Sequence, residues 1–245
     1  MEVWEIAGVK VKELYKSYEV AGSPVPVLKG LELELDASRI TVILGRSGCG
    51  KTTFLRVVSG LEGCERGSVE MDGEIKTGIV FQEPRLMPWL NVWKNITFGL
   101  KKQEIEPAYI EELIRMTGLT GFEYAYPSQL SGGMQQRAAL ARALAYRASY
   151  LLMDEPFAAL DHFTRQAMQQ ELLRIHREKG MGVLFVTHSI DEALILGNRI
   201  VILEDGRIAK DYEIGDHSCP RDLLSQDMID IKRRIIKRIE GGNLL

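Results

Sequence analysis

One short segment constrains this chain more than any other, a glycine-rich turn between a buried strand and a helix. The apolar run ITVILG, from Ile40 to Gly45, has the continuous hydrophobicity of a strand that is buried on both faces. The turn GRSGCGKT follows, and then FLRVVSGL with helical spacing. This turn fits GxxxxGK[ST], in which glycines let backbone N–H groups surround phosphate oxygens. The sequence therefore predicts a phosphate-binding loop at the start of a helix.

Two side chains of this loop have the chemistry of a nucleotide site. Lys51 is expected to reach the β- and γ-phosphates, and the Thr52 hydroxyl to bind Mg²⁺. The alternative, an ordinary glycine-rich turn, is disfavoured because pattern and context agree. The loop residues that we expect to bind nucleotide are Gly45, Arg46, Ser47, Gly48, Cys49, Gly50, Lys51, Thr52 and Thr53.

A second polar feature stands at the end of another apolar strand. The segment YLLMDEP places Asp154 and Glu155 directly after a hydrophobic run. An aspartate at a strand end near a phosphate loop commonly holds Mg²⁺, directly or through water. Glu155 is then placed to orient or deprotonate an attacking water. The alternative is an acidic pair that merely ends a strand at the surface.

Strands and helices alternate along the chain, which predicts an α/β fold with a mainly parallel core sheet. Between Gln82 and Ser131 the strand signals stop, and the pattern becomes helical and loop-like. We expect alternating strands at VKVKELYKSY and VLKGLELEL, buried strands at Gly78–Gln82, Tyr150–Asp154, GVLFVTH and RIVILED, and helices at Pro107–Thr117, Gly132–Arg147 and His162–Lys179.

Composition narrows the class of protein. The 245 residues, 45% of them hydrophobic, suffice for one large domain. A net charge of −3 argues against general nucleic-acid binding. Cys49, Cys64 and Cys219 form no CxxC pair, which indicates a reducing compartment. No secretory signal is evident, and no apolar run approaches the ~20 residues that span a bilayer. We therefore expect a soluble protein that reaches any membrane through a partner.

The segment LSGGMQQR is a second candidate anion site. Ser131 occupies an N-cap position, and two glycines open the helix that follows. The exposed amides of such a helix start can receive phosphate oxygens. Taken alone, the segment would more often be an ordinary helix start.

The order of these motifs resembles that of ABC-transporter ATPases over nearly the whole chain. LSGGM, between the phosphate loop and YLLMDEP, looks like their signature motif. Tyr18 resembles the aromatic residue that stacks on adenine, Gln82 the Q-loop glutamine, and His188 the switch histidine. AALD, Ala158 to Asp161, looks like the D-loop. Two departures are Ala158, where serine is frequent, and the signature ending in Met134 and Gln135.

The resemblance implies a fold and a mechanism. The fold would be that of a P-loop NTPase with an antiparallel β subdomain and a helical subdomain. It would form a single domain, 1–245, with its core at about 1–82 and 132–245 and its helical subdomain at about 83–131. Two such domains would pair head to tail, with the signature of one covering the ATP of the other. The implied residues are Glu155, His188, Lys51 and Gln82 for catalysis, Thr52, Gln82 and Asp154 for Mg²⁺, and Tyr18, Ser131, Gly132, Gly133 and Gln135 beside the loop for ATP.

Phe157 and LMPWLNVWKNITFGL resemble importer ATPases, nearest to the group serving nitrate, sulfonate and taurine. The implied partners are a second ATPase subunit, a separate transmembrane permease and an extracytoplasmic solute-binding protein, at the cytoplasmic face of the cell membrane and without nucleic acid. Leu86, Trp89 and their apolar neighbours could dock the permease or simply pack the helical insertion. Alternatives are an ABC exporter or lipid-handling ATPase, or a soluble ABC ATPase. For the tail IDIKRRIIKRIE we favour a helix packed through Ile231, Ile235 and Ile239 over one lying on a membrane.

Overall fold

The computed structural model describes residues 8–71, 75–158, 160–215 and 221–241. They form two compact units, one from the described parts of Met1–Glu74 and Gly182–Leu245 (unit 1) and one from those of Ile75–Met181 (unit 2). The predicted helical subdomain, 83–131, falls inside unit 2, and its boundaries stay a prediction. Cys219 and Ala159, the second residue of the predicted D-loop, lie outside the described residues.

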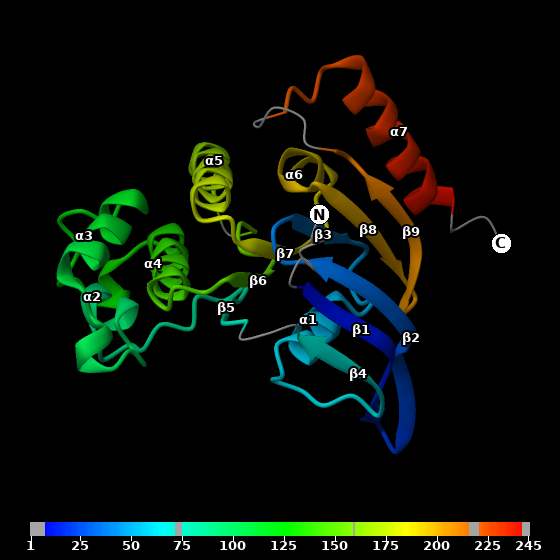
Figure 1. Ribbon diagram of the computed structural model, residues 1–245, viewed down its shortest axis with the longest axis horizontal. Coiled ribbons are helices and arrows are strands. Elements are labelled where there is room, and N and C mark those ends of the chain that lie inside the picture. Colours follow the sequence, from blue (N-terminus) through cyan, green and yellow to red (C-terminus); the bar gives the residue numbers. More distant parts are fainter. Residues whose placement is uncertain (1–7, 72–74, 159, 216–220, 242–245) are drawn as a thin grey trace, which may run out of the picture. The chain divides into compact units, whose positions relative to one another are not determined.

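Unit 1 contains two sheets (Figure 1). One is antiparallel, in the order β2-β1-β4. In the other, β3 pairs in parallel with both β7 and β8, and β9 adds an antiparallel edge to β8. The elements are β1 (Gly8–Val20), β2 (Ser23–Asp36), β3 (Ile40–Leu44), α1 (Lys51–Val58), β4 (Arg66–Met71), β7 (Gly182–Thr187), α6 (Ile190–Leu196), β8 (Arg199–Glu204), β9 (Arg207–Glu213) and α7 (Gln226–Gly241).

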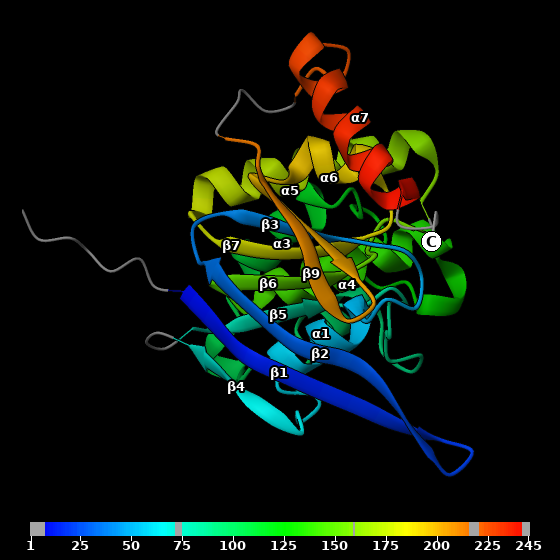
Figure 2. The ribbon, with the colours of Figure 1, turned by 90° about the vertical axis from the view of Figure 1, so that its right-hand side faces the viewer.

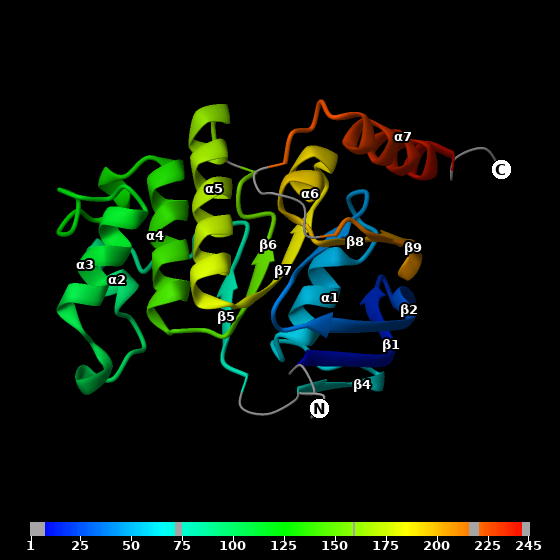
Figure 3. The same ribbon diagram turned by 45° about the horizontal axis from the view of Figure 1, so that its top comes forward.

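Strands β3 and β7 are buried at every residue, as continuous apolar runs require when helices cover both faces of a sheet. Figure 3 shows α1 between the two sheets and α6 on the opposite face. Helix α7 packs beside α6 (Figure 2), with Ile235 fully buried and Ile231 and Ile239 half-buried. The prediction that this tail packs its isoleucines on the domain is confirmed.

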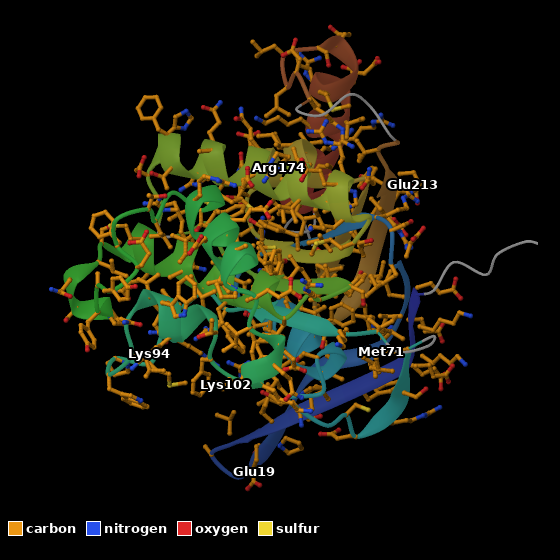
Figure 4. All side chains as sticks on the ribbon, turned by 60° about the vertical axis from the view of Figure 1, so that its left-hand side comes forward. Glu19, Met71, Lys94, Lys102, Arg174 and Glu213 are labelled. Carbon is orange, nitrogen blue, oxygen red and sulfur yellow. The ribbon has the colours of Figure 1, made fainter. Side chains whose placement is uncertain are left out.

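Unit 2 holds the parallel pair β5–β6 and most of the helices. Helix α4 packs against α2, α3 and β5, which makes it the central element of this unit. Helix α5 has a charged outer side, where Arg174 pairs with Glu171 and Glu178 (Figure 4). The elements are β5 (Thr77–Val80), α2 (Val92–Ile96), η1 (Lys102–Glu104), α3 (Pro107–Met116), η2 (Pro127–Gln129), α4 (Gly132–Ala145), β6 (Tyr150–Asp154) and α5 (His162–Lys179).

Two predicted elements end earlier than expected. The strand expected to reach Gln82 stops at Val80, because the Phe81 carbonyl accepts a hydrogen bond from a helix side chain instead of a neighbouring strand. The helix expected to reach Arg147 stops at Ala145, since Arg147 has a positive φ of 50° that cannot continue a right-handed helix.

Candidate functional site

The phosphate loop lies at the carboxyl edge of the parallel sheet of unit 1. Leu44 is paired with Thr187 on the neighbouring strand, so the residues that follow, Gly45 and His188, leave the sheet side by side. Open α/β sheets bind ligands outside the carboxyl ends of their strands. Two sequence-predicted segments, far apart in the chain, are thereby brought to one edge.

The backbone of the loop requires its glycines. Gly48 and Gly50 have φ values of 82° and 107°, where side chains are strained. A Cβ on Gly45 would lie 2.4 Å from the Leu203 carbonyl oxygen. Lys51 is buried, and its Nζ donates to the carbonyls of Gly45 and Arg46 at 2.9 and 3.0 Å. The ammonium group thus points into the loop that would surround a phosphate.

The remaining loop side chains have different surroundings. Arg46 is exposed and donates to the Ile239 carbonyl of α7 at 2.9 Å. Cys49 is half-buried, and burial raises the pKa of its thiol, so the neutral form prevails near neutral pH. Thr52 is exposed on the first turn of α1, and Thr53 is buried. The exposed amides and hydroxyl at this helix start have the chemistry of an anion site.

Tyr18 is held near this loop by a contact that sequence reasoning missed. Its hydroxyl donates to Glu62 Oε2 at 2.5 Å and lies 3.4 Å from Thr53 Oγ1. Burial and the bond to Glu62 raise the pKa of Tyr18, and the same bond lowers the pKa of Glu62. Arg56 also donates to Glu62, at 3.0 Å. The ring is half-buried and held at its hydroxyl end, and its stacking on adenine stays a prediction.

We expect Tyr18→Ala to raise the KM for ATP about ten-fold while leaving kcat within about two-fold, because stacking on a base contributes binding that is uniform along the reaction. Tyr18→Phe keeps the ring and should stay near the wild-type KM. Steady-state phosphate release measures both constants. An unchanged KM in Tyr18→Ala would remove the residue from the nucleotide site.

The turn that carries His188 is braced by three polar side chains. Thr187 Oγ1 donates to Glu192 at 2.6 Å and accepts from the Ser189 amide at 3.0 Å. Ser189 caps α6 by accepting from the Glu192 amide at 3.3 Å. The sequence signal for this brace was a serine followed three residues later by glutamate, the pattern of a helix start. His188 itself is exposed.

In unit 2 the same geometry recurs at the ends of β5 and β6. Val80 pairs in parallel with Met153, so Gln82 and the Asp154–Glu155 pair follow at one edge. Asp154 is 5% exposed, whereas Gln82 is exposed. Glu155 is half-buried and has a positive φ of 43°, a conformation that costs a non-glycine residue about 1 kcal/mol or more. Such strain is typical of functional positions.

Ser131 caps α4 as predicted, accepting from the Met134 amide at 3.3 Å. Ser131 and Gly132 are exposed, and Gly133 is half-buried. Gln135 instead turns its amide back toward the preceding segment, donating to the carbonyls of Pro127 and Leu130. The helix start is therefore open to a ligand, while the contribution of Gln135 stays a prediction.

A comparison with known protein families identifies the arrangement. The ABC transporter family matches residues 28–158, from the second strand through the phosphate loop and the signature segment to the carboxylate pair. The chain belongs to the ABC transporter ATP-binding family. The predicted family and the predicted P-loop NTPase fold of this ABC ATPase are confirmed.

Relatives of this ABC ATPase span nearly its whole length. An uncharacterized ABC transporter ATP-binding protein of Methanocaldococcus jannaschii is 46% identical over 242 residues, covering 93% of this chain and 90% of the relative. An aliphatic sulfonates import ATP-binding protein SsuB of Bacillus subtilis is 40% identical, covering 95% and 93%. One of Pseudomonas syringae is 41% identical, covering 89% and 92%.

A solved structure is also similar to this ABC ATPase. It is a dimeric ATP-binding cassette in a post-hydrolysis state bound to ADP and Pi, with a TM-score of 0.79 and 31% identity. The match covers 85% of this chain and 100% of that one. The ABC ATPase thus has the fold of a cassette that forms dimers and hydrolyses ATP, and it is an ATP-binding motor subunit.

Proposed function

We propose that the chain is the motor of an importer for a small organic anion of the aliphatic sulfonate class, working with a separate transmembrane permease. The observation that carries this proposal is the identity of about 40% to sulfonate import ATPases over nearly the full length of both chains. Among the described residues, no helix is both long and apolar enough to cross a bilayer. The proposed position is the cytoplasmic face of the membrane, with a solute-binding protein delivering the cargo on the other side.

The residues of the site are suited to Mg²⁺·ATP as the substrate. Hydroxyl and carboxylate oxygens are the ligands that Mg²⁺ prefers, and the exposed Thr52 and the strand-end Asp154 would supply one of each. No cluster of three or more His, Cys, Asp or Glu side chains suited to a metal occurs in the described ranges, which fits an ion held largely by phosphates and water. Mg²⁺ would neutralise charge on the phosphates, with Gln82 as a further oxygen ligand.

Each remaining residue has a proposed task in hydrolysis. Lys51 and His188 stabilise charge on the transferring phosphoryl group. Glu155 takes the proton of the attacking water, which Gln82 helps to orient. In a head-to-tail dimer, the exposed start of α4 at Ser131 covers the γ-phosphate bound by the partner subunit. ATP therefore stabilises the closed dimer, and hydrolysis removes that stabilisation.

Unit 2 presents a surface suited to the permease. The segment from Met87 to Asn91 is fixed by Asn95, a fully buried side chain that donates to the carbonyls of Met87 and Leu90. The amides of Val92 and Trp93 bond to the carbonyls of Ala125 and Glu123, so this segment lies beside 123–125. Together the two segments expose Trp89 (69%) and Tyr124 (79%). Leu86, which directly precedes the first of these segments, is half-buried, so we assign it to packing more than to docking.

We expect Trp89→Ala to uncouple transport from hydrolysis. The side chain is largely exposed, so its removal should leave the fold stable and the basal ATPase rate of the purified chain within about two-fold of wild type. An aromatic anchor that becomes buried at an interface contributes about 2 kcal/mol or more to the binding free energy, so contact with the permease should weaken. Uptake should fall at least about ten-fold. Phe163→Ala, which removes an aromatic side chain 80% exposed on α5, is the control for transport. Loss of basal ATPase in Trp89→Ala would instead indicate a folding defect.

Deletion of the gene in its own organism tests the cargo class. The strain should lose growth with an alkanesulfonate as the sole sulfur source and keep growth on sulfate. A plasmid encoding the wild-type chain should restore growth, and one encoding Glu155→Gln should not. Normal growth on unsubstituted alkanesulfonates, with a defect on taurine as the sulfur source or on nitrate as the nitrogen source, would assign the cargo to taurine or nitrate instead; no defect on any of the three would overturn the importer proposal.

A further inference from the structure

Helix α4 holds the segment 81–85, which carries Gln82, through side chains that bond to its backbone. Gln136 Nε2 donates to the Phe81 carbonyl at 2.9 Å. Arg142, six residues further along the same helix, donates to the carbonyls of Pro84 and Arg85, both at 2.8 Å. The segment is thus fixed at its two ends by one helix, and we call these three hydrogen bonds the α4 clamp.

The clamped segment is also braced internally. The Arg85 guanidinium lies over the Phe81 ring, 4.0 Å from the centroid, and Arg85 adopts a positive φ of 47°. Gln82 lies between these two residues and is exposed. The backbone on either side of Gln82 therefore has little freedom to move apart from α4.

Packing alone does not explain a buried glutamine at position 136. The side chain is 3% exposed, and its Oε1 has no hydrogen-bond partner among the described residues. A buried, unsatisfied acceptor typically destabilises a fold, and a methionine of similar length would avoid that cost. Gln136 also borders a small cavity of about 10 Å³, shared with Val80, Met153 and Pro156 at the ends of β5 and β6. The amide is therefore best explained by the bond that it donates to Phe81.

The same helix begins at Ser131, five residues before Gln136 and so about 7.5 Å away along the axis. We propose that Gln136 and Arg142 are positioning residues that make the Gln82 segment and the signature end of α4 move as one body. This inference rests on the proposed roles of Gln82 at its own ATP and of Ser131 at the ATP of the partner subunit. ATP arriving at Gln82 then moves Ser131 toward the opposite site, and the two sites of the dimer act cooperatively.

The test uses Gln136→Met, which keeps the volume and removes the donor, and Arg142→Lys, which keeps the charge but replaces the two guanidinium nitrogens that each hold one carbonyl by a single nitrogen. Matched controls are Gln169→Met, a buried glutamine of α5, and Arg147→Lys, an arginine just beyond α4. Phosphate release by the full-length chain, measured against ATP concentration, gives kcat, KM and the Hill coefficient. Hydrogen exchange of the amides of residues 81–85, measured without nucleotide, reports the clamp directly.

Both clamp variants should lower kcat roughly five- to twenty-fold, a loss within the range that mutations of coupling residues produce. They should also bring the Hill coefficient from above 1 toward 1. Exchange at 81–85 should rise, the binding of a fluorescent ATP analogue to the monomer should stay within about two-fold, and the controls should match the wild type. Unchanged kcat and Hill coefficient in both variants, unchanged exchange, or a wild-type Hill coefficient of 1 would overturn the proposal.

Failure of the underlying roles has a different signature. If Gln82→Ala and Ser131→Ala retain full kcat, the proposed function of those residues is wrong and the coupling falls with it. If these two lose activity while Gln136→Met and Arg142→Lys keep it, only the clamp is wrong.

Discussion

Replacing Glu155 by glutamine is expected to reduce ATP hydrolysis at least about a hundred-fold, because an amide cannot accept the proton of the attacking water. The substitution keeps the size of the side chain and its hydrogen-bonding reach. It also leaves the positive φ of 43° at this position, so stability should change little. Binding of ATP should persist, since the γ-phosphate loses no cationic partner. Phosphate release and equilibrium binding, measured in parallel, separate the two effects.

The control for that change is Glu178→Gln, which neutralises an exposed carboxylate of α5 paired with Arg174. It should hydrolyse ATP at the wild-type rate, because a surface pair contributes at most about 1 kcal/mol to stability and none to the chemistry. A second variant, Glu155→Gly, relieves the backbone strain while removing the carboxylate. It should be at least as stable as the wild type and equally inactive as Glu155→Gln. Normal hydrolysis in either Glu155 variant would exclude this carboxylate as the base.

Lys51→Met should abolish turnover through a different route, the loss of phosphate binding. Lys51 is buried within the loop, with its ammonium on the carbonyls of Gly45 and Arg46, and ATP phosphates are its natural counter-charge. Methionine fills the space of the lysine stem but carries no charge. We expect ATP affinity to fall at least about thirty-fold and turnover at least about a hundred-fold, consistent with loss of a charge-assisted contact to the phosphates.

Lys102→Met is the matched control, since Lys102 is an exposed residue of η1. Binding of a fluorescent ATP analogue and phosphate release should both stay at wild-type values there. If Lys51→Met bound ATP as tightly as the control, the phosphates would not rest on this loop.

The elements that the sequence predicted well are those whose burial is continuous. Strands β3, β6 and β7 are buried at every residue, and their apolar runs are unmistakable. The elements that it missed have little burial, because β4 and the edge strand β9 are exposed or half-buried at every residue. Neither strand alternates buried with exposed residues, so no hydrophobic period marks it in the sequence, whereas the edge strand β2 does alternate and was predicted. Helix α6 spans only Ile190–Leu196 and was too short for its period to be seen.

The candidate site divides in the same way. The phosphate loop is one contiguous motif of eight residues. Its glycines mark the positions where the backbone must adopt a positive φ or approach another chain segment closely, so the loop could be predicted from these residues alone. The partners of its outlying members are distant in sequence: Glu62 lies 44 residues from Tyr18, and Gln136 lies 55 residues from Phe81. Their contacts arise only when strands and helices fold together. The local sequence around a single glutamate or glutamine does not predict which distant residue it will bond.

The central claim, that ATP joins two copies through the phosphate loop of one and the α4 start of the other, is tested by the mass of Glu155→Gln with and without Mg²⁺·ATP. Gly132→Glu is the second variant, because a Cβ at Gly132 would meet no atom within 4 Å and acidic side chains suit a helix start. Its carboxylate would repel a γ-phosphate. Size-exclusion chromatography with light scattering should give 27.6 kDa without nucleotide and twice that mass with Mg²⁺·ATP. The double variant, Glu155→Gln combined with Gly132→Glu, should stay monomeric with Mg²⁺·ATP. If both the single and the double variant were monomers with Mg²⁺·ATP, or both were dimers, the account would be contradicted.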